Sequence, residues 1–105
     1  MKIRTDKKFI KDLKKRKKNR ELLKLVNAKV AAIGALIADT ETVDEVVKLV
    51  PNILKMKGYD YHYLIRLGDF RLGVFFEVDF DETEGVLIFQ CCVHRKDIYR
   101  EFPDE

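Results

Sequence analysis

Apolar positions change their period halfway along the chain, and this change divides it into a helical part and a β part. Residues 7–18 place three apolar side chains on one helical face, and residues 21–38 repeat apolar side chains at three- and four-residue spacing. A break at Asn19 or Arg20 separates the two segments, so they are predicted to form a helical hairpin whose apolar face covers another element. Residues 2–5 are predicted to form a short edge strand.

Capping signals mark two shorter helices. Thr42 and Glu45 have the spacing of a capping box, and they predict a short helix that Pro51 ends. Near the end of the chain, Asp97 is predicted to cap a last helical turn before Pro103. Both helices are therefore predicted from residues at their ends.

The second half of the chain alternates apolar and polar residues, which is typical of strands with one buried face. Two alternating runs, residues 59–67 and 70–80, flank a Gly-Asp dipeptide at 68–69, and this arrangement predicts a tight β-hairpin. Residues 81–85 are predicted to form the next turn, and residues 86–94 a third strand. The fold class is therefore predicted as α+β: an N-terminal helical hairpin packed on a small antiparallel β-sheet, with a short C-terminal helical turn.

Length and composition fit a single domain over residues 1–105, because the chain is 47% hydrophobic and 37% charged. No apolar run approaches the roughly 20 residues that span a bilayer, and the N-terminus contains no secretory apolar segment. The expectation is a cytoplasmic protein without a membrane segment. Cys91 and Cys92 are adjacent in an apolar run, which predicts reduced, buried thiols. Apart from these cysteines, the sequence has only two histidines, His62 and His94, so no metal site or cofactor is expected.

Charge is unevenly distributed along the chain. Residues 1–20 contain eleven Lys and Arg against Asp6 and Asp12, which gives +9. The whole chain carries +3, so the other 85 residues sum to −6. This asymmetry predicts a polyanionic or acidic partner for the N-terminal segment, although a solvated, lysine-rich helix face would give the same pattern.

The predicted hairpin sets a register between its strands. A two-residue loop places Leu67 opposite Phe70 and Arg66 opposite Arg71. Like charges directly opposite each other destabilise a sheet by up to about 1 kcal/mol, so the pair is expected to serve a ligand unless both side chains diverge into water. A phosphate is the ligand that two guanidinium groups match best, because each donates hydrogen bonds in pairs.

His94 is predicted to lie on the same surface as this arginine pair. Strict alternation along residues 86–94 puts the even-numbered side chains on one face and the odd-numbered ones, Cys91 among them, toward the helices. Gly73, which has no side chain, is predicted to leave a depression beside Arg71.

The cationic and aromatic residues around this surface suit RNA cleavage without a metal. Internal transesterification needs a base for the 2′-hydroxyl, charge stabilisation for the phosphorane and an acid for the leaving 5′-oxygen. Arginines supply the charge, and histidine or tyrosine side chains move protons or stack on bases. The candidates are Arg66, Arg71, His94, Arg95 and Tyr99.

Two stretches resemble a known family. The sequences "MKGYDYHYLIRLGDFRLGVFFE" (residues 56–77) and "VLIFQCCVHRKDIYREF" (residues 86–102) are similar to the RelE branch of the RelE/ParE superfamily of type II toxin–antitoxin toxins. The hairpin pattern and the His-Arg-x-Asp-Ile-Tyr ending are together fairly specific to this branch. The charge and length of the N-terminal helical pair extend the resemblance over essentially the whole chain.

The resemblance implies a fold, an activity and residue roles. The family fold is a small antiparallel sheet packed against two N-terminal helices. RelE-type toxins cut mRNA in the ribosomal A site through its own 2′-hydroxyl, and the basic helices contact ribosomal RNA. Arg71 would stabilise the phosphorane, Arg95 corresponds to the arginine after the last strand, and Tyr99 would stack on the substrate base or assist proton transfer. His94 stands where several members carry a histidine or a lysine.

One position departs from the family pattern. Ribosome-dependent members carry lysines on the first hairpin strand, where this chain has His62 and Leu64. Lys55 and Lys57 lie just upstream and are expected to compensate, unless His62 itself is the general base. The expected substrate contacts are Arg66, His62, Lys55, Lys57 and Lys96.

Two other functions stay open at the level of the sequence. The ParE branch shares the fold but inhibits DNA gyrase and is not a nuclease. A toxin-like fold that only binds RNA or an antitoxin, without catalysis, is the third reading. Either toxin branch implies a small cognate antitoxin that wraps the toxin and neutralises its arginine-rich surface.

Overall fold

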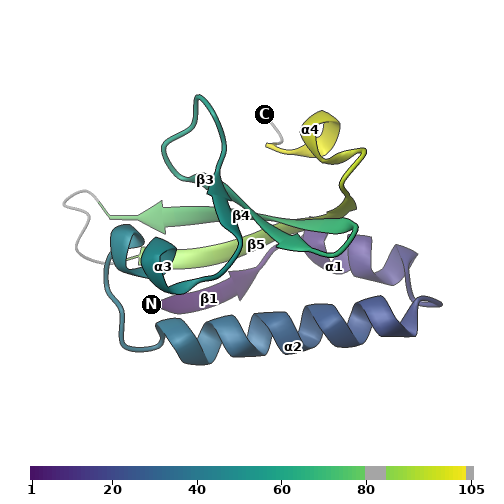
Figure 1. Cartoon of the computed structure of the whole chain (residues 1–105), viewed down its shortest axis with the longest axis horizontal. Coiled ribbons are helices and arrows are strands. Elements are labelled where there is room, and N and C mark those ends of the chain that lie inside the picture. Colours follow the sequence, from purple (N-terminus) through teal and green to yellow (C-terminus); the bar gives the residue numbers. More distant parts are fainter. Residues whose placement is uncertain (80–84, 104–105) are drawn as a thin grey trace.

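The computed structural model describes residues 1–79 and 85–103, and the predicted helices and strands are present in it (Figure 1). The predicted turn at 81–85 lies, except for its last residue, outside the described residues. β2 has no counterpart among the predicted elements. In chain order, the elements are β1 (Lys2–Thr5), α1 (Lys7–Lys15), α2 (Arg20–Ile37), α3 (Val43–Leu49), β2 (Ile53–Lys55), β3 (His62–Leu67), β4 (Phe70–Val78), β5 (Gly85–His94) and α4 (Ile98–Glu101).

The five strands form one mixed sheet in the order β1-β5-β4-β3-β2. β5 pairs with β4 and β4 with β3 in the antiparallel direction, as predicted, and the unpredicted β2 is antiparallel to β3. β1, however, runs parallel to β5, with Lys2 opposite Val86. The α+β class is confirmed, whereas the expectation of a wholly antiparallel sheet is wrong for this first strand. No short turn connects β1 to β5, so the sequence around β1 does not indicate whether the two strands pair in the parallel or the antiparallel direction.

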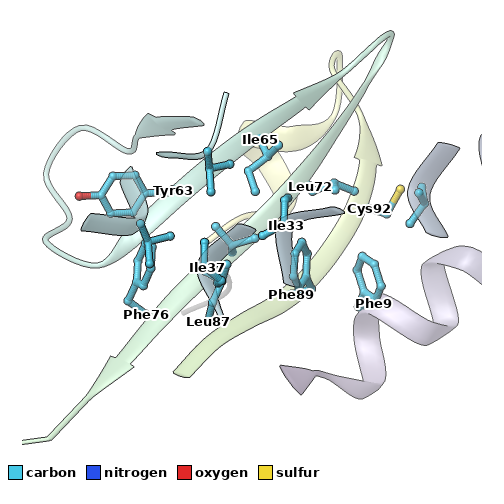
Figure 2. Packing of buried hydrophobic residues seen from close by; sticks show 14 of the residues in the cluster. Phe9, Ile33, Ile37, Tyr63, Ile65, Leu72, Phe76, Leu87, Phe89 and Cys92 are labelled. Atoms are coloured by element: carbon cyan, nitrogen blue, oxygen red, sulfur yellow. The ribbon is translucent and has the colours of Figure 1, made fainter. Parts of the chain in front are cut away.

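The two N-terminal helices cover one face of the sheet, and α4 lies on the other side (Figure 1). Figure 2 shows the main core, where Phe9 of α1 meets Phe89 of β5 with ring centroids 5.7 Å apart. Ile33 and Ile37 of α2 belong to the same cluster as these two rings. Burial of side chains of this size contributes about 1.5–3 kcal/mol each, so hydrophobic burial holds the helices to the sheet. None of the described helices is long and apolar enough to cross a membrane.

Side-chain caps explain where α2 and α3 begin. Asn19 accepts a hydrogen bond from the Leu22 N–H at 3.1 Å, which confirms the predicted break before α2. The capping box also forms as predicted, because the Glu45 N–H donates to Thr42 Oγ1 and the Thr42 N–H donates to Glu45 Oε1, each at 3.2 Å. Hydrogen bonds from the side chain and the backbone N–H of Thr42 lower the pKa of Glu45.

A β-bulge interrupts the pairing of β4 with β5. Gly73 pairs with Cys91 and the next residue, Val74, pairs with Phe89, so Gln90 is an extra residue on β5. One extra residue inverts the alternation of every side chain that follows it. The second half of β5 therefore faces the opposite way from the strictly alternating prediction.

Beyond the bulge, Cys92 rather than Cys91 lies in the main core. Cys91 and Val93 point to the other face of the sheet, where they join a smaller apolar cluster. Burial raises the pKa of Cys91 to about 12 and that of Cys92 to about 11, so both are thiols at neutral pH. The prediction that Cys91 faces the helices is wrong, and the prediction of buried, unbridged thiols is confirmed. The smaller cluster comprises Met56, Leu64, Cys91, Val93, Ile98 and Phe102.

Candidate functional site

The tip of the β3–β4 hairpin carries the arginine pair that the sequence predicts. Leu67 lies opposite Phe70 and Arg66 opposite Arg71, so the two-residue loop and its register are confirmed. Gly68 has a left-handed backbone with φ of 58°, which a tight hairpin loop requires and glycine adopts without strain. Because the residues on either side of each arginine pack against the main core, both arginines lie on the face that also carries α4.

Arg71 is held against the hairpin loop. Its Nη1 donates to the carbonyl oxygens of Gly68 and Phe70, both at 2.8 Å. These bonds leave Nη2 and Nε to donate to an anion. Arg66, on the neighbouring strand, is exposed. One fixed and one exposed guanidinium on neighbouring strands suit a phosphate bound between them.

Arg95 reaches the same loop from the end of β5. Its backbone N–H donates to the carbonyl oxygen of Asp69 at 2.8 Å, and its Nε lies 3.9 Å from Asp69 Oδ1. The two side chains are 58% and 69% exposed, so this ion pair contributes at most about 1 kcal/mol and a phosphate can displace it. Three arginines from three segments therefore lie around one loop.

His94 lies on the face opposite to Arg71, because the β-bulge inverts the end of β5. It is the cross-strand partner of Phe70, and the two rings meet edge to face with centroids 5.4 Å apart. The guanidinium of Arg16 lies 4.7 Å from the centre of the same Phe70 ring. His94 Nδ1 accepts a hydrogen bond from the Lys96 N–H at 3.1 Å. The prediction that His94 shares a face with the arginine pair is wrong.

Tyr99 projects from α4 and is 77% exposed. Its neighbours on the helix, Ile98 and Phe102, are buried in the smaller apolar cluster and fix α4 to the sheet. The Phe102 ring lies directly over Gly73, where an added Cβ would come within 2.8 Å of Phe102 Cδ1. The depression predicted at Gly73 is therefore filled by Phe102.

Polar contacts lie at both ends of α4. Asp97 precedes the helix as predicted, but its side chain does not cap it, because its backbone is helical and the carboxylate accepts from Arg100 instead. At the other end, Glu101 accepts from Lys8 Nζ at 3.2 Å, and Lys8 also lies 3.1 Å from the buried Asp12. Burial lowers the pKa of Lys8, but hydrogen bonds to Asp12 and Glu101 outweigh it and raise that pKa above its ordinary value. These contacts tie α4 to α1.

His62 lies at the far end of β3 from the arginine pair. It precedes Arg66 by four residues, and the rise of a strand separates the two by about 13 Å. Its half-buried ring packs among three other rings, so the structure does not bring it to the hairpin loop. The ring centroids lie 5.1 Å from Tyr59, 4.7 Å from Phe75 and 5.6 Å from Phe102.

Lys55 and Lys57 lie near the same end of β3. Lys55 ends β2 opposite Tyr63, and Lys57 follows it in a turn. Both are exposed, and Lys55 Nζ lies 3.9 Å from Asp60 Oδ1. The two lysines are therefore accessible from solvent, but they do not lie beside the arginine pair.

Arg16 and Phe102 shape this region although the sequence assigned neither of them a role. Arg16 belongs to the basic segment of residues 1–20, and its contact with Phe70 brings the end of α1 to the hairpin tip. The positive charge of that segment is visible in the sequence, but the sequence does not indicate that Arg16 lies at the hairpin tip. The contact of Phe102 with Gly73 has no local signal at all. Within residues 1–79 and 85–103, no three His, Cys, Asp or Glu side chains are grouped so that they could hold a metal ion.

Fold and site together define a small α+β domain whose hairpin tip carries clustered arginines that could bind an anion. No family model matches the chain. Toxin RelE3 of Methanocaldococcus jannaschii is 35% identical to it over 104 residues, which cover 98% of this chain and 100% of that toxin. The chain therefore belongs to the RelE family of toxins. A chain in the crystal structure of the RelB-RelE antitoxin-toxin complex from Methanococcus jannaschii is 29% identical, with a TM-score of 0.49 over 95% of this chain and 99% of that one.

Proposed function

We propose that this RelE family member is the toxin of a toxin–antitoxin pair and cuts mRNA on cytoplasmic ribosomes by transesterification. The observation that carries the proposal is the grouping of Arg66, Arg71 and Arg95 around one hairpin loop. Like charges directly opposite each other destabilise a sheet, and an anion bound among them removes that cost. Membership in the RelE family makes the phosphate of an RNA backbone the anion of choice.

In the proposed reaction the 2′-oxygen bonds to phosphorus as its proton leaves to a base. The bond from phosphorus to the 5′-oxygen then breaks, and that oxygen takes up a proton, which leaves a 2′,3′-cyclic phosphate and a 5′-hydroxyl. Negative charge builds on the phosphorane oxygens. Arg71, already held by two carbonyl groups, and Arg95, released from Asp69, neutralise this charge.

The histidines lie away from the reacting phosphate in this proposal. The chain contains two, of which His94 lies on the opposite face and His62 about 13 Å from Arg66. Tyr99, exposed on the α4 face, is assigned the base contact or an assisting role in proton transfer. With so few acid–base groups at the arginines, the message must be presented in a reactive geometry, and the ribosome provides it.

The partners of the proposed toxin follow from its charge. Helix α1 carries much of the basic N-terminal segment, and Arg16 at its end lies over Phe70, on the face opposite to the arginine pair. We therefore assign ribosomal RNA to the basic helices and the message to the arginine face. The RelE chain of the Methanococcus jannaschii complex is bound to the antitoxin RelB. We infer that a cognate antitoxin of this chain covers the arginines and keeps RNA from them.

The proposal is tested by inducing the chain in cells and mapping the ends of messages that ribosomes carry. Wild type is expected to stop translation and to leave new message ends in the A-site codon. Arg71→Ala is expected to cut about 100- to 1,000-fold more slowly, because one charge donor to the transition state is lost. The matched control is Arg4→Ala, since Arg4 is an exposed arginine on β1, at the far edge of the sheet, paired with Glu77 at 3.0 Å.

Two results contradict the proposal and each identifies another function. Blocked DNA supercoiling with intact messages assigns the chain to gyrase inhibition of the ParE type. A folded chain that affects neither process is a binding module without catalysis.

A further inference from the structure

The outer side of α2 is apolar along its second half. Between Ala28 and Ala38 the only charged residue is Lys29. Leu25 and Leu36 are 54% and 44% exposed, although both are large and apolar. A helix that is apolar on both its inner and its outer side is normally buried on both. The outer face of α2 comprises the exposed residues Leu25, Ala28, Ala31, Ala32, Ala35 and Leu36, together with Ala38 directly after the helix.

The spacing on this face is that of a helix-pairing seam. Ala28, Ala31, Ala35 and Ala38 recur at alternating intervals of three and four residues, as the seam positions of a two-helix coiled coil do. The buried residues of α2, such as Ile33, lie on the inner side and pack on the sheet. Alanines at the seam let two backbones approach closely, so the outer face suits another helix.

The charges at the two ends of α2 select the partner. Lys24 continues the seam at the N-terminal end, and Asp39 and Glu41 follow the helix at its C-terminal end. In an antiparallel pair of α2 helices centred near Ala31, Lys24 of each copy lies beside Asp39 of the other. The two helix dipoles also oppose each other favourably. An acidic helix of another protein would meet Asp39 and Glu41 with repulsion, whereas a second copy is complementary along the whole length.

We propose that the outer face of α2 is a homodimer interface, on which a second copy of this chain packs its α2 in the antiparallel direction. The arginine site is not covered by such a dimer, because α2 and α4 lie on opposite sides of the sheet (Figure 1). Whether the dimer forms can therefore be tested independently of the proposed RNA cleavage.

Sedimentation equilibrium of the full chain over a range of concentrations tests the proposal. Wild type is expected to have the mass of two chains. Ala31→Glu is expected to weaken the dimer at least about 100-fold, because two carboxylates are then buried at the two-fold axis. The control Thr5→Glu adds the same charge at an exposed position of β1 and leaves the dimer intact. A monomeric wild type, or a dimer that tolerates Ala31→Glu, overturns the proposal and leaves the outer face to a helix of an antitoxin.

A charge exchange tests the antiparallel direction. Lys24→Glu and Asp39→Lys are each expected to weaken the dimer about tenfold, since each places like charges together twice. The double variant restores the pairs with reversed sign and regains the wild-type affinity. Positions 24 and 39 lie about 22 Å apart along one chain, so the restoration requires a second copy. Failure of the double variant to recover contradicts the proposed direction.

Discussion

One face of the sheet is covered by α1, α2 and the main core, whereas the other is covered by α4 and the segment between β2 and β3 (Figure 1). The first face buries the rings of Phe76 and Phe89 completely. The second depends largely on Ile98 and Phe102, which a four-residue helix and its end carry. The arginine pair lies on this second face. The helix-covered face therefore supplies most of the stability, and the thinly covered face positions the residues that we assign to RNA.

Truncation of one ring on each face gives the largest expected difference. Phe89→Ala is expected to lower the free energy of unfolding by about 3–5 kcal/mol, because it leaves a cavity in the main core. Phe102→Ala is expected to cost no more than about 2 kcal/mol, because α4 can detach while the rest of the fold persists. Urea denaturation followed by circular dichroism measures both. Equal losses would show that the two faces unfold as one unit.

Gly73→Ala perturbs the α4 face alone. The new Cβ would lie 2.5 Å from Cys91 Sγ and 2.8 Å from the Phe102 ring, so α4 must move, at a cost of about 1–3 kcal/mol. Hydrogen exchange is expected to accelerate in residues 98–102, and RNA cleavage to fall about tenfold or more as Tyr99 is displaced. The control Gly34→Ala meets only the flexible end of Ile3 at 3.3 Å. Unchanged exchange in α4 would refute this account of its anchoring.

Substitutions of Tyr99 and His94 compare the two faces of the sheet through their effects on the rate of RNA cleavage. Tyr99→Ala is expected to slow cleavage about ten- to 100-fold, the value of one base-stacking contact. Tyr99→Phe retains most of the rate if stacking is the role and loses it if the phenol moves a proton. His94→Ala is expected to have the smaller effect, because this side chain faces away from Arg71. A greater loss for His94→Ala than for Tyr99→Ala, measured on ribosome-bound message, contradicts the assignment.

The smallest expected effect is the pH dependence of the link between the faces. Lys8, which bridges α1 and α4, has a pKa raised above 10.5, so its protonated form stabilises the fold at neutral pH. That contribution, about 1 kcal/mol or less for this partly exposed group, is lost as the pH rises above 10.5 through the folded-state pKa. Lys8→Met is therefore expected to be less stable than wild type at pH 7 and equally stable above the folded-state pKa. A difference in urea midpoint that persists there would exclude an electrostatic origin.

Local signals predicted the parts of the fold that local interactions determine. The capping box of Thr42 and Glu45 and the register of Arg66 with Arg71 depend on residues close in sequence, and both are confirmed. The α+β class was predicted from the period of the apolar residues, and the family from two continuous stretches, residues 56–77 and 86–102. The proposed roles of Arg71 and Arg95 gain a shared location from the structure, since the end of β5 is bonded to the hairpin loop.

Long-range geometry was not predictable in the same way. The extra residue Gln90 in the β-bulge has no distinct signature, and missing it placed His94 on the wrong face. The parallel pairing of β1 with β5 and the Phe102 ring over Gly73 join residues that are distant in the chain. Such contacts depend on how finished elements pack, so alternation and spacing within one segment do not contain them.

The central claim is that the arginines of the hairpin tip act on the phosphate of ribosome-bound mRNA. Its most direct test is the single-turnover cleavage rate of a defined message on purified ribosomes, compared for wild type, Arg71→Ala and Arg4→Ala. The account predicts cleavage within the A-site codon by wild type and Arg4→Ala, and a rate about 100- to 1,000-fold lower for Arg71→Ala. An uncut message with wild type, or a wild-type rate with Arg71→Ala, contradicts it.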